Sequence, residues 1–125
     1  MKTSVRKCPI CNQHVKLNGI GPSNNPKFSW ALSHIYALSC DLFKLAGDNH
    51  DMGYHMLDYG KKKADDEFLA EMLDVANDRP WYSRRWYKYQ ARKFYLAVAH
   101  GGQTSYDEAQ AECLKAVNLA SRRVK

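Results

Sequence analysis

Apolar residues recur three or four positions apart over most of the chain, which is the spacing of a helix face. The first such stretch covers residues 28–45 and is expected to end at Gly47. The same spacing predicts four further helices, over residues 48–59, 63–76, 80–100 and 106–122. No stretch reads convincingly as a strand, although a small hairpin fits residues 8–17. The pattern therefore predicts an all-α protein.

Residues that favour helix ends fall at the limits of these stretches. Asp48 is expected to cap the second helix, and Gly60 to stop it. Pro80 suits the start of the fourth helix, which Gly101 and Gly102 are expected to break. The helix ends thus agree with the apolar pattern.

The length of 125 residues fits one domain, residues 1–125. Within it we expect a cysteine knuckle at residues 1–16, a glycine-bearing loop at 17–27 and a helical core at 28–125. With 45% hydrophobic residues, the chain has enough apolar side chain for one core. This composition excludes a wholly disordered protein.

The charge balance favours an anionic partner. Lys and Arg number 19 against 13 Asp and Glu, a net charge of +6. No apolar stretch follows the basic residues of the amino terminus, and nowhere do 18 apolar residues run together. We therefore expect neither a signal peptide nor a transmembrane segment.

The basic excess is greatest in residues 79–95, which hold six Lys or Arg, seven aromatics and no acid. In helical projection Arg85, Lys88 and Arg92 form a stripe beside an apolar stripe, which is expected to hold most of the aromatics in the core. The basic stripe fits anionic lipid headgroups or nucleic-acid phosphates. A solvated face without a partner is the alternative.

The second and third predicted helices combine residue types used in acid–base catalysis. His50 and Tyr54 lie four residues apart and share a helix face. Asp65 points along the apolar face of the third helix, where a carboxylate needs a partner, and we prefer it to Asp66 for that reason. If the two helices pack antiparallel across the turn at Gly60, Asp65 meets His50 and holds it in one tautomer. Such a pair indicates a general base.

Asp51 and a glycine-bearing loop suggest a cation beside this pair. In Gly19-Ile20-Gly21 the backbone carbonyls can converge without a side chain in the way, although both glycines also suit an ordinary turn. A hard cation such as Ca²⁺ takes carboxylate and carbonyl oxygens. It would polarise an ester carbonyl while His50 removes a proton from water. The combination indicates ester hydrolysis.

Four motifs, spread over roughly residues 17–102, resemble the phospholipase A2 superfamily, most closely the small phospholipase A2-like proteins of bacteriophages and prophages. The motifs are Asn18-Gly19-Ile20-Gly21-Pro22, His50-Asp51-Met52-Gly53-Tyr54, Lys62-Lys63-Ala64-Asp65-Asp66-Glu67-Phe68-Leu69, and Arg92-Lys93-Phe94-Tyr95-Leu96-Ala97-Val98 before Gly101-Gly102.

This resemblance implies a Ca²⁺-dependent hydrolase that cleaves the sn-2 ester of glycerophospholipids, with a phospholipid membrane surface as its substrate. The protein is then expected in the host cytoplasm or in the virion. It implies His50 as the base, Asp65 as the residue that orients it and Tyr54 as the support of Asp65. It implies four calcium ligands, the carboxylate of Asp51 and the carbonyls of Leu17, Gly19 and Gly21. The alternative is a non-catalytic phage protein of the same fold, which binds nucleic acid or a host protein through its basic helix.

Cys8-Pro9-Ile10-Cys11 has the spacing of a zinc knuckle, in which two thiolates reach one tetrahedral Zn²⁺. The remaining ligands would come from further along the chain: His14, and then Cys40 or Cys113. A free or redox-active pair and a disulfide bridge are the alternatives. Cys113 also fits a small core residue, and His55 has no predicted partner.

Overall fold

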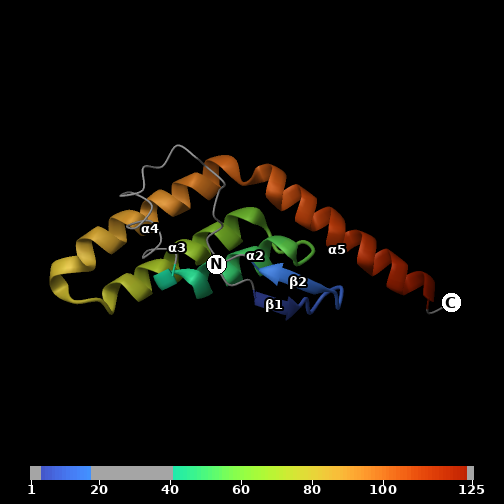
Figure 1. Cartoon of the computed structure of the whole chain (residues 1–125). Coiled ribbons are helices and arrows are strands. Elements are labelled where there is room, and N and C mark those ends of the chain that lie inside the picture. Colours follow the sequence, from blue (N-terminus) through green and yellow to red (C-terminus); the bar gives the residue numbers. More distant parts are fainter. Residues whose placement is uncertain (1–3, 18–40, 124–125) are drawn as a thin grey trace, which may run out of the picture.

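The computed structural model describes residues 4–17 and 41–123, and helices make up most of them (Figure 1). Two short strands, β1 (Ser4–Lys7) and β2 (His14–Leu17), form an antiparallel hairpin. The helices that follow are α2 (Lys44–His55), α3 (Lys61–Asn77), α4 (Trp81–Gly101) and α5 (Gln103–Arg123). The predicted all-α class is confirmed, with one small sheet beside the helices.

The hairpin is longer than the 8–17 segment suggested by the sequence. Ser4 lies opposite Leu17 and Lys7 opposite His14, so the Cys-x-x-Cys segment forms the connection between the strands. The backbone N–H of Cys8 donates to the carbonyl of Gln13 at 2.8 Å, which closes this connection. Strands of four residues are too short to show a clear alternation of apolar and polar positions.

The start of α2 differs from the prediction. The helix begins at Lys44, not Asp48, and it continues through Gly47, which is buried within it. Phe43 occupies the N-cap position, and Asp48 lies inside the helix, where its carboxylate accepts a hydrogen bond at 2.8 Å from the side chain of Lys44 one turn earlier. The helix ends at His55, before the predicted limit at residue 59, and Gly60 does not stop it but immediately precedes α3, with a φ of 101°. The predicted helix at 28–45 falls mostly outside the described residues.

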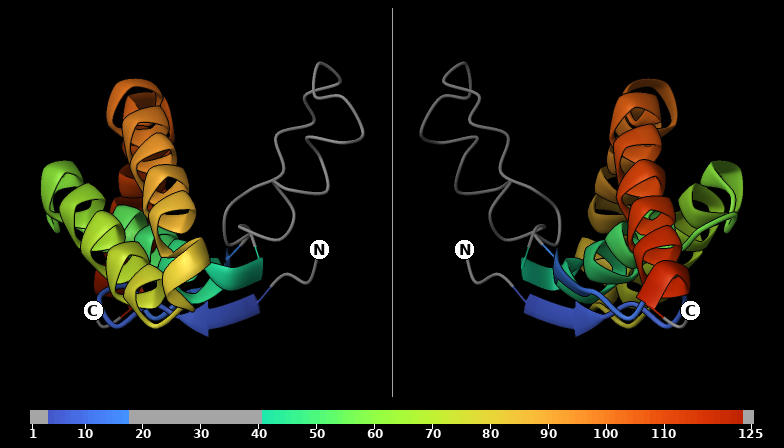
Figure 2. Two further views of the ribbon diagram at one scale, coloured as in Figure 1. Left: turned by 90° about the vertical axis from the view of Figure 1, so that its left-hand side faces the viewer. Right: turned by 90° about the vertical axis from the view of Figure 1, so that its right-hand side faces the viewer.

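The three later helices lie close to their predicted positions. Consecutive helices α3 and α4 run side by side in opposite directions (Figures 1 and 2). Their shared core with the start of α2 consists of buried side chains from all three segments: Phe43, Ala46, Phe68, Met72, Ala91 and Phe94. The hairpin lies beside α2, on the side away from α4 (Figure 2). Thus α2, which carries His50, is enclosed between α3 and the hairpin.

Gly102 forms the junction between α4 and α5. Its N–H donates to the carbonyl of Val98 at 2.8 Å, which ends α4. A Cβ atom at this position would lie 2.6 Å from both the Tyr54 hydroxyl and the Val98 carbonyl oxygen. Glycine is therefore required here by close packing against Tyr54. Beyond the junction α5 changes direction, and its last turns extend past the hairpin (Figure 1).

Among the helices that the structure describes, none combines the length and the apolar character needed to cross a membrane.

Candidate functional site

His50 and Asp65 meet between α2 and α3, as the sequence predicts. The Nε2 atom of His50 lies 2.6 Å from Oδ1 of Asp65, and both side chains are buried. The contact is possible because the two helices are antiparallel and close: a Cβ atom on Gly53 would be 3.1 Å from the Cβ of Ala64. The small residues at this crossing bring the imidazole and the carboxylate within hydrogen-bond distance.

Asp65 has two further donors. The hydroxyl of Tyr54 donates to the same Oδ1 atom at 2.6 Å, and the ammonium of Lys61 donates to Oδ2 at 2.7 Å. Lys61 also donates to the carbonyls of Val98 and Ala99 at the end of α4. The carboxylate is thus held from α2, from the first turn of α3 and, through Lys61, from α4. Lys61 was not among the predicted site residues, although its spacing of four residues from Asp65 is a known ion-pair signal.

The surroundings fix the protonation states of this group. Burial raises the pKa of Asp65, but the hydrogen bonds from Lys61, Tyr54 and His50 outweigh it and hold that pKa below its ordinary value. Burial lowers the pKa of His50, an effect that the hydrogen bond with Asp65 only partly offsets. Burial and the bond to Asp65 raise the pKa of Tyr54. At neutral pH the group therefore consists of an ionised carboxylate, a neutral imidazole and a protonated phenol.

A neutral imidazole beside an ionised carboxylate has only one favourable tautomer. Because the carboxylate can only accept, Nε2 of His50 carries the proton and donates it to Asp65. Nδ1 then has the free lone pair, and no hydrogen bond joins it to the described residues. The ring is fixed by Tyr54 and Phe68, whose centroids lie 4.2 Å and 4.6 Å from its own. Such an imidazole is oriented to accept a proton through Nδ1.

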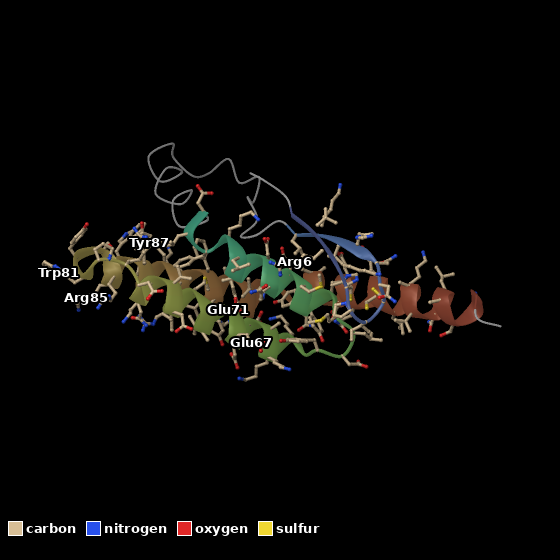
Figure 3. All side chains as sticks on the ribbon, turned by 90° about the horizontal axis from the view of Figure 1, so that it is seen from below. Arg6, Glu67, Glu71, Trp81, Arg85 and Tyr87 are labelled. Carbon is tan, nitrogen blue, oxygen red and sulfur yellow. The ribbon has the colours of Figure 1, made fainter. Side chains whose placement is uncertain are left out.

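A pocket of about 250 Å³ opens next to His50, between α2, α3 and the hairpin. Its polar side includes Glu67 and a chain of three hydrogen-bonded side chains, in which Arg6 donates to Asn49 at 2.6 Å and Asn49 donates to Glu71 at 2.8 Å. Figure 3 shows Arg6, Glu67 and Glu71 gathered along this side. Met52 of α2, Met56 just after this helix and Phe68 of α3 form its apolar wall. The pocket gives a small molecule access to the region of the imidazole.

The competing carboxylate, Asp66, faces away from His50. It is exposed, and it accepts hydrogen bonds from Lys62 at 2.7 Å and from Tyr95 at 3.1 Å. The one-residue shift along α3 therefore separates the two carboxylates as the apolar face predicts.

Only half of the expected calcium ligands lie in the described residues. Asp51 is half-buried on α2, directly after His50. Leu17 ends β2, and its side chain is fully buried beside Met52. Gly19 and Gly21 lie outside the described residues. Among the described residues, Asp51 belongs to no group of three or more side chains that could hold a metal.

A second cluster lies at the other end of α2. Cys8, Cys11, His55 and Cys113 are all buried, and their ligand atoms lie within 4.8 Å of one another. The Sγ atom of Cys11 is 3.2 Å from Nε2 of His55. Three elements contribute: the hairpin, the last residue of α2 and the middle of α5.

This cluster corrects the predicted zinc ligands. His14 is exposed on β2, opposite Lys7, and is not part of the cluster. His55 takes the third position and Cys113 the fourth, while Cys40 lies outside the described residues. The sequence could not reveal the partnership of His55 with Cys11, because 44 residues separate them and only the packing of the hairpin on α2 joins them.

The basic face of α4 is as predicted for two of its three residues. Arg85 and Arg92 are exposed, whereas Lys88 is half-buried. Among the aromatics of this helix, Phe94 is buried and Tyr87 packs against the core. Trp81, Tyr82 and Tyr89 are exposed, by 81%, 74% and 57%, and of the seven aromatics in residues 79–95 only Phe94 is buried, so the expectation that most of them lie in the core is wrong. Figure 3 shows Trp81 and Arg85 at the end of the molecule where α4 begins.

Comparison of the chain with protein-family models, with curated proteins and with solved structures finds no match.

Proposed function

We propose that this chain is a phospholipase A2-like hydrolase that cleaves the sn-2 ester of glycerophospholipids. One observation carries the proposal: Oδ1 of Asp65 accepts two hydrogen bonds, from Nε2 of His50 and from the hydroxyl of Tyr54, each at 2.6 Å. This is the arrangement that the sequence resemblance implies for these three residues. A buried Asp–His pair with one free ring nitrogen and an adjoining pocket supports hydrolysis with water as the nucleophile.

In the proposed reaction, Nδ1 of His50 accepts a proton from a water molecule, and the water oxygen forms a bond to the ester carbonyl carbon. The resulting imidazolium is stabilised by the ionised carboxylate of Asp65. It then returns the proton to the leaving alkoxide as the ester C–O bond breaks. The products are a free fatty acid and a lysophospholipid, and His50 is neutral again.

Tyr54 and Lys61 are positioning residues in this mechanism. Both donate to Asp65, so they keep its carboxylate ionised and its orientation fixed toward the imidazole. Neither of these two hydrogen bonds involves Nδ1 of His50. Their role is to maintain the tautomer on which proton abstraction depends.

Calcium is the metal that the resemblance implies for this site. Asp51, adjacent to His50 on α2, would supply its carboxylate, and the carbonyls of Leu17, Gly19 and Gly21 would complete the ligands. A carboxylate and several carbonyl oxygens suit a hard cation. Bound there, Ca²⁺ would stabilise negative charge that develops on the ester oxygen.

The experiment is release of fatty acid from vesicles of phosphatidylglycerol by the purified chain. We expect release in millimolar Ca²⁺, loss of release in EGTA, and recovery on adding Ca²⁺ but not Mg²⁺ or Zn²⁺. His50→Ala is expected to lower the rate by at least about 10²-fold, which is the usual contribution of general-base catalysis. His14→Ala, which changes an exposed histidine, is the matched control and is expected to keep the full rate.

The rival function is binding of nucleic acid or a host protein through the exposed arginines of α4. An absence of lipolysis under all these conditions, together with salt-sensitive binding of DNA or RNA, would contradict the hydrolase and support the rival.

A further inference from the structure

The cysteine–histidine cluster at the hairpin has no part in the proposed hydrolysis. Cys8 and Cys113 are completely buried, Cys11 is 8% exposed and His55 is 3% exposed. The same interior cluster contains Leu17, Met52 and Ala116, with Val15, Met56 and Val117 packed against it. Three thiols and an imidazole are thus gathered inside an otherwise apolar interface. Burying this many polar groups together is costly unless something satisfies them.

The composition of the cluster is that of a metal site. Three sulfur atoms and one imidazole nitrogen lie within 4.8 Å of one another, which suits four ligands around a single tetrahedral ion. Two of the sulfurs come from a Cys-x-x-Cys turn, the usual way in which one chain segment gives two ligands. No carboxylate is among the four, so a hard cation such as Ca²⁺ or Mg²⁺ does not fit.

The turn around Cys8 and Cys11 is also shaped for this purpose. Asn12 has a φ of 62°, which bends the chain back immediately after the second cysteine. Its N–H donates to the carbonyl of Cys8 at 2.9 Å. Both thiols consequently face α2 and α5 on the same side of the hairpin. Such a preformed turn lowers the conformational cost of binding a metal.

We infer that Cys8, Cys11, His55 and Cys113 bind one structural Zn²⁺ that fastens the hairpin to α2 and α5. Zinc is the metal that most often occupies a closed site of three cysteines and one histidine. Four protein ligands fill its coordination, so no position is left for a catalytic water. Binding displaces the protons of the three thiols into solvent, and no oxidant or reductant is needed.

The position of this ion links it to the candidate active site. His55 directly follows Tyr54, whose hydroxyl donates to Asp65. A metal bond to His55 would fix the last turn of α2 and thereby the backbone that carries Tyr54. The zinc site would stabilise the fold whether or not the chain hydrolyses phospholipids.

The first test is the metal content of the full chain, purified without added metal or chelator. We expect about one zinc per chain by elemental analysis. Cys113→Ser and His55→Ala are each expected to lose most of it. His14→Ala, an exposed histidine of the same hairpin, is the matched control and is expected to keep it. Iron or copper in place of zinc would overturn the assignment, and so would full zinc retention by both ligand variants.

A second measurement uses only the wild-type chain, because a ligand variant can fail to fold. After removal of metal with a chelator under reducing conditions, Co²⁺ is expected to give the visible absorption of a tetrahedral site and a thiolate-to-cobalt charge-transfer band. Added Zn²⁺ is expected to abolish both bands and to raise the melting temperature, whereas Ca²⁺ leaves them unchanged. A chain that contains no metal as purified and gives no Co²⁺ spectrum would overturn the inference. A Cys8–Cys11 disulfide, detected as an intact mass two hydrogens lower, would do the same.

Discussion

His50 and Asp65 are 15 residues apart in the sequence, and their side chains meet at 2.6 Å between Nε2 and Oδ1. The same carboxylate oxygen accepts a hydrogen bond from the hydroxyl of Tyr54, and the other oxygen accepts one from the ammonium of Lys61. This one carboxylate therefore joins the imidazole to two supporting side chains. Its neighbour Asp66 is exposed and takes part in none of these contacts.

The two adjacent carboxylates allow a matched comparison of activity. Asp65→Asn is expected to lower the rate of fatty acid release by about 10²-fold or more, because the amide no longer stabilises the imidazolium. Asp66→Asn removes an equal charge from the exposed side of α3 and is expected to leave the rate unchanged.

Tyr54→Phe serves as the milder variant in this assay. It removes one hydrogen bond to Asp65 but not the carboxylate, so the rate is expected to fall between about twofold and tenfold. Equal activities of the Asp65 and Asp66 variants would show that Asp65 does not orient the base.

Substitution by alanine is expected to destabilise the fold at Gly102 but not at Gly101. At Gly102 a Cβ atom would lie 2.6 Å from both the Tyr54 hydroxyl and the Val98 carbonyl oxygen, so Gly102→Ala forces the helix junction apart. We expect a loss of about 1–3 kcal/mol in the free energy of unfolding. At Gly101 nothing lies within 4 Å of the added atom, and Gly101→Ala is expected to cost nothing. Chemical denaturation of both variants measures the difference, and equal destabilisation would contradict the close packing on Tyr54.

The lowered pKa of Asp65 predicts a loss of stability in acid. Because the folded pKa lies below the ordinary value of 3.8, the carboxylate stabilises the fold at pH values above 3.8. This contribution disappears as the pH falls through the folded pKa. Lys61 is the donor that lowers this pKa most, so Lys61→Met is expected to raise the folded pKa toward 3.8 and thereby to reduce the acid-induced loss of stability below pH 3.8.

Lys62→Met provides the control for this pH dependence. Lys62 pairs with Asp66 on the exposed side of α3, where solvent weakens the interaction. The free energy of unfolding, measured in urea from about pH 7 to about pH 2, is expected to change its pH dependence more in the Lys61 variant than in the Lys62 variant, because solvent screens the exposed pair of Lys62 and Asp66. Identical curves for the two lysine variants would be inconsistent with a partly buried ion pair between Lys61 and Asp65.

The basic face of α4 is expected to bind anionic membranes. Arg85→Glu with Arg92→Glu removes two exposed cations, each worth about 1 kcal/mol near an anionic surface, so binding to phosphatidylglycerol vesicles should weaken by roughly thirtyfold or more. Lys115→Glu with Arg122→Glu makes the same charge change on exposed residues of α5 and is expected to have a smaller effect. Vesicle sedimentation compares the pairs. Equal losses would mean that net charge, rather than this face, determines binding.

The helices that the sequence predicts best are those whose apolar face also forms the core. On α3, Phe68 and Met72 are four residues apart and both buried, so the spacing alone places the helix and its face. The same argument places Asp65 on that face and brings it to His50. Local pattern and tertiary packing agree here, which is why this part of the candidate site is readable from the sequence.

The errors arose where tertiary contacts override local signals. Gly47 and Asp48 have the residue types of a helix end and a cap, yet packing of the start of α2 on α3 and α4 buries both within the helix. His14 is near Cys11 in sequence but exposed, whereas His55 is distant in sequence and adjacent in space. Trp81 is exposed although its helix has a regular apolar stripe, because α4 begins beyond the end of the shared core.

The position of the bond that is cleaved tests the central proposal most directly. The substrate is a phosphatidylglycerol with different acyl chains at sn-1 and sn-2, presented in vesicles with Ca²⁺, and mass spectrometry identifies the fatty acid released. We expect the wild-type chain to release only the sn-2 fatty acid and the His50→Ala chain, with its zinc content unchanged, to release neither. Release of the sn-1 chain, equal release by the two proteins, or no release by the wild type would contradict the proposed phospholipase A2-like activity.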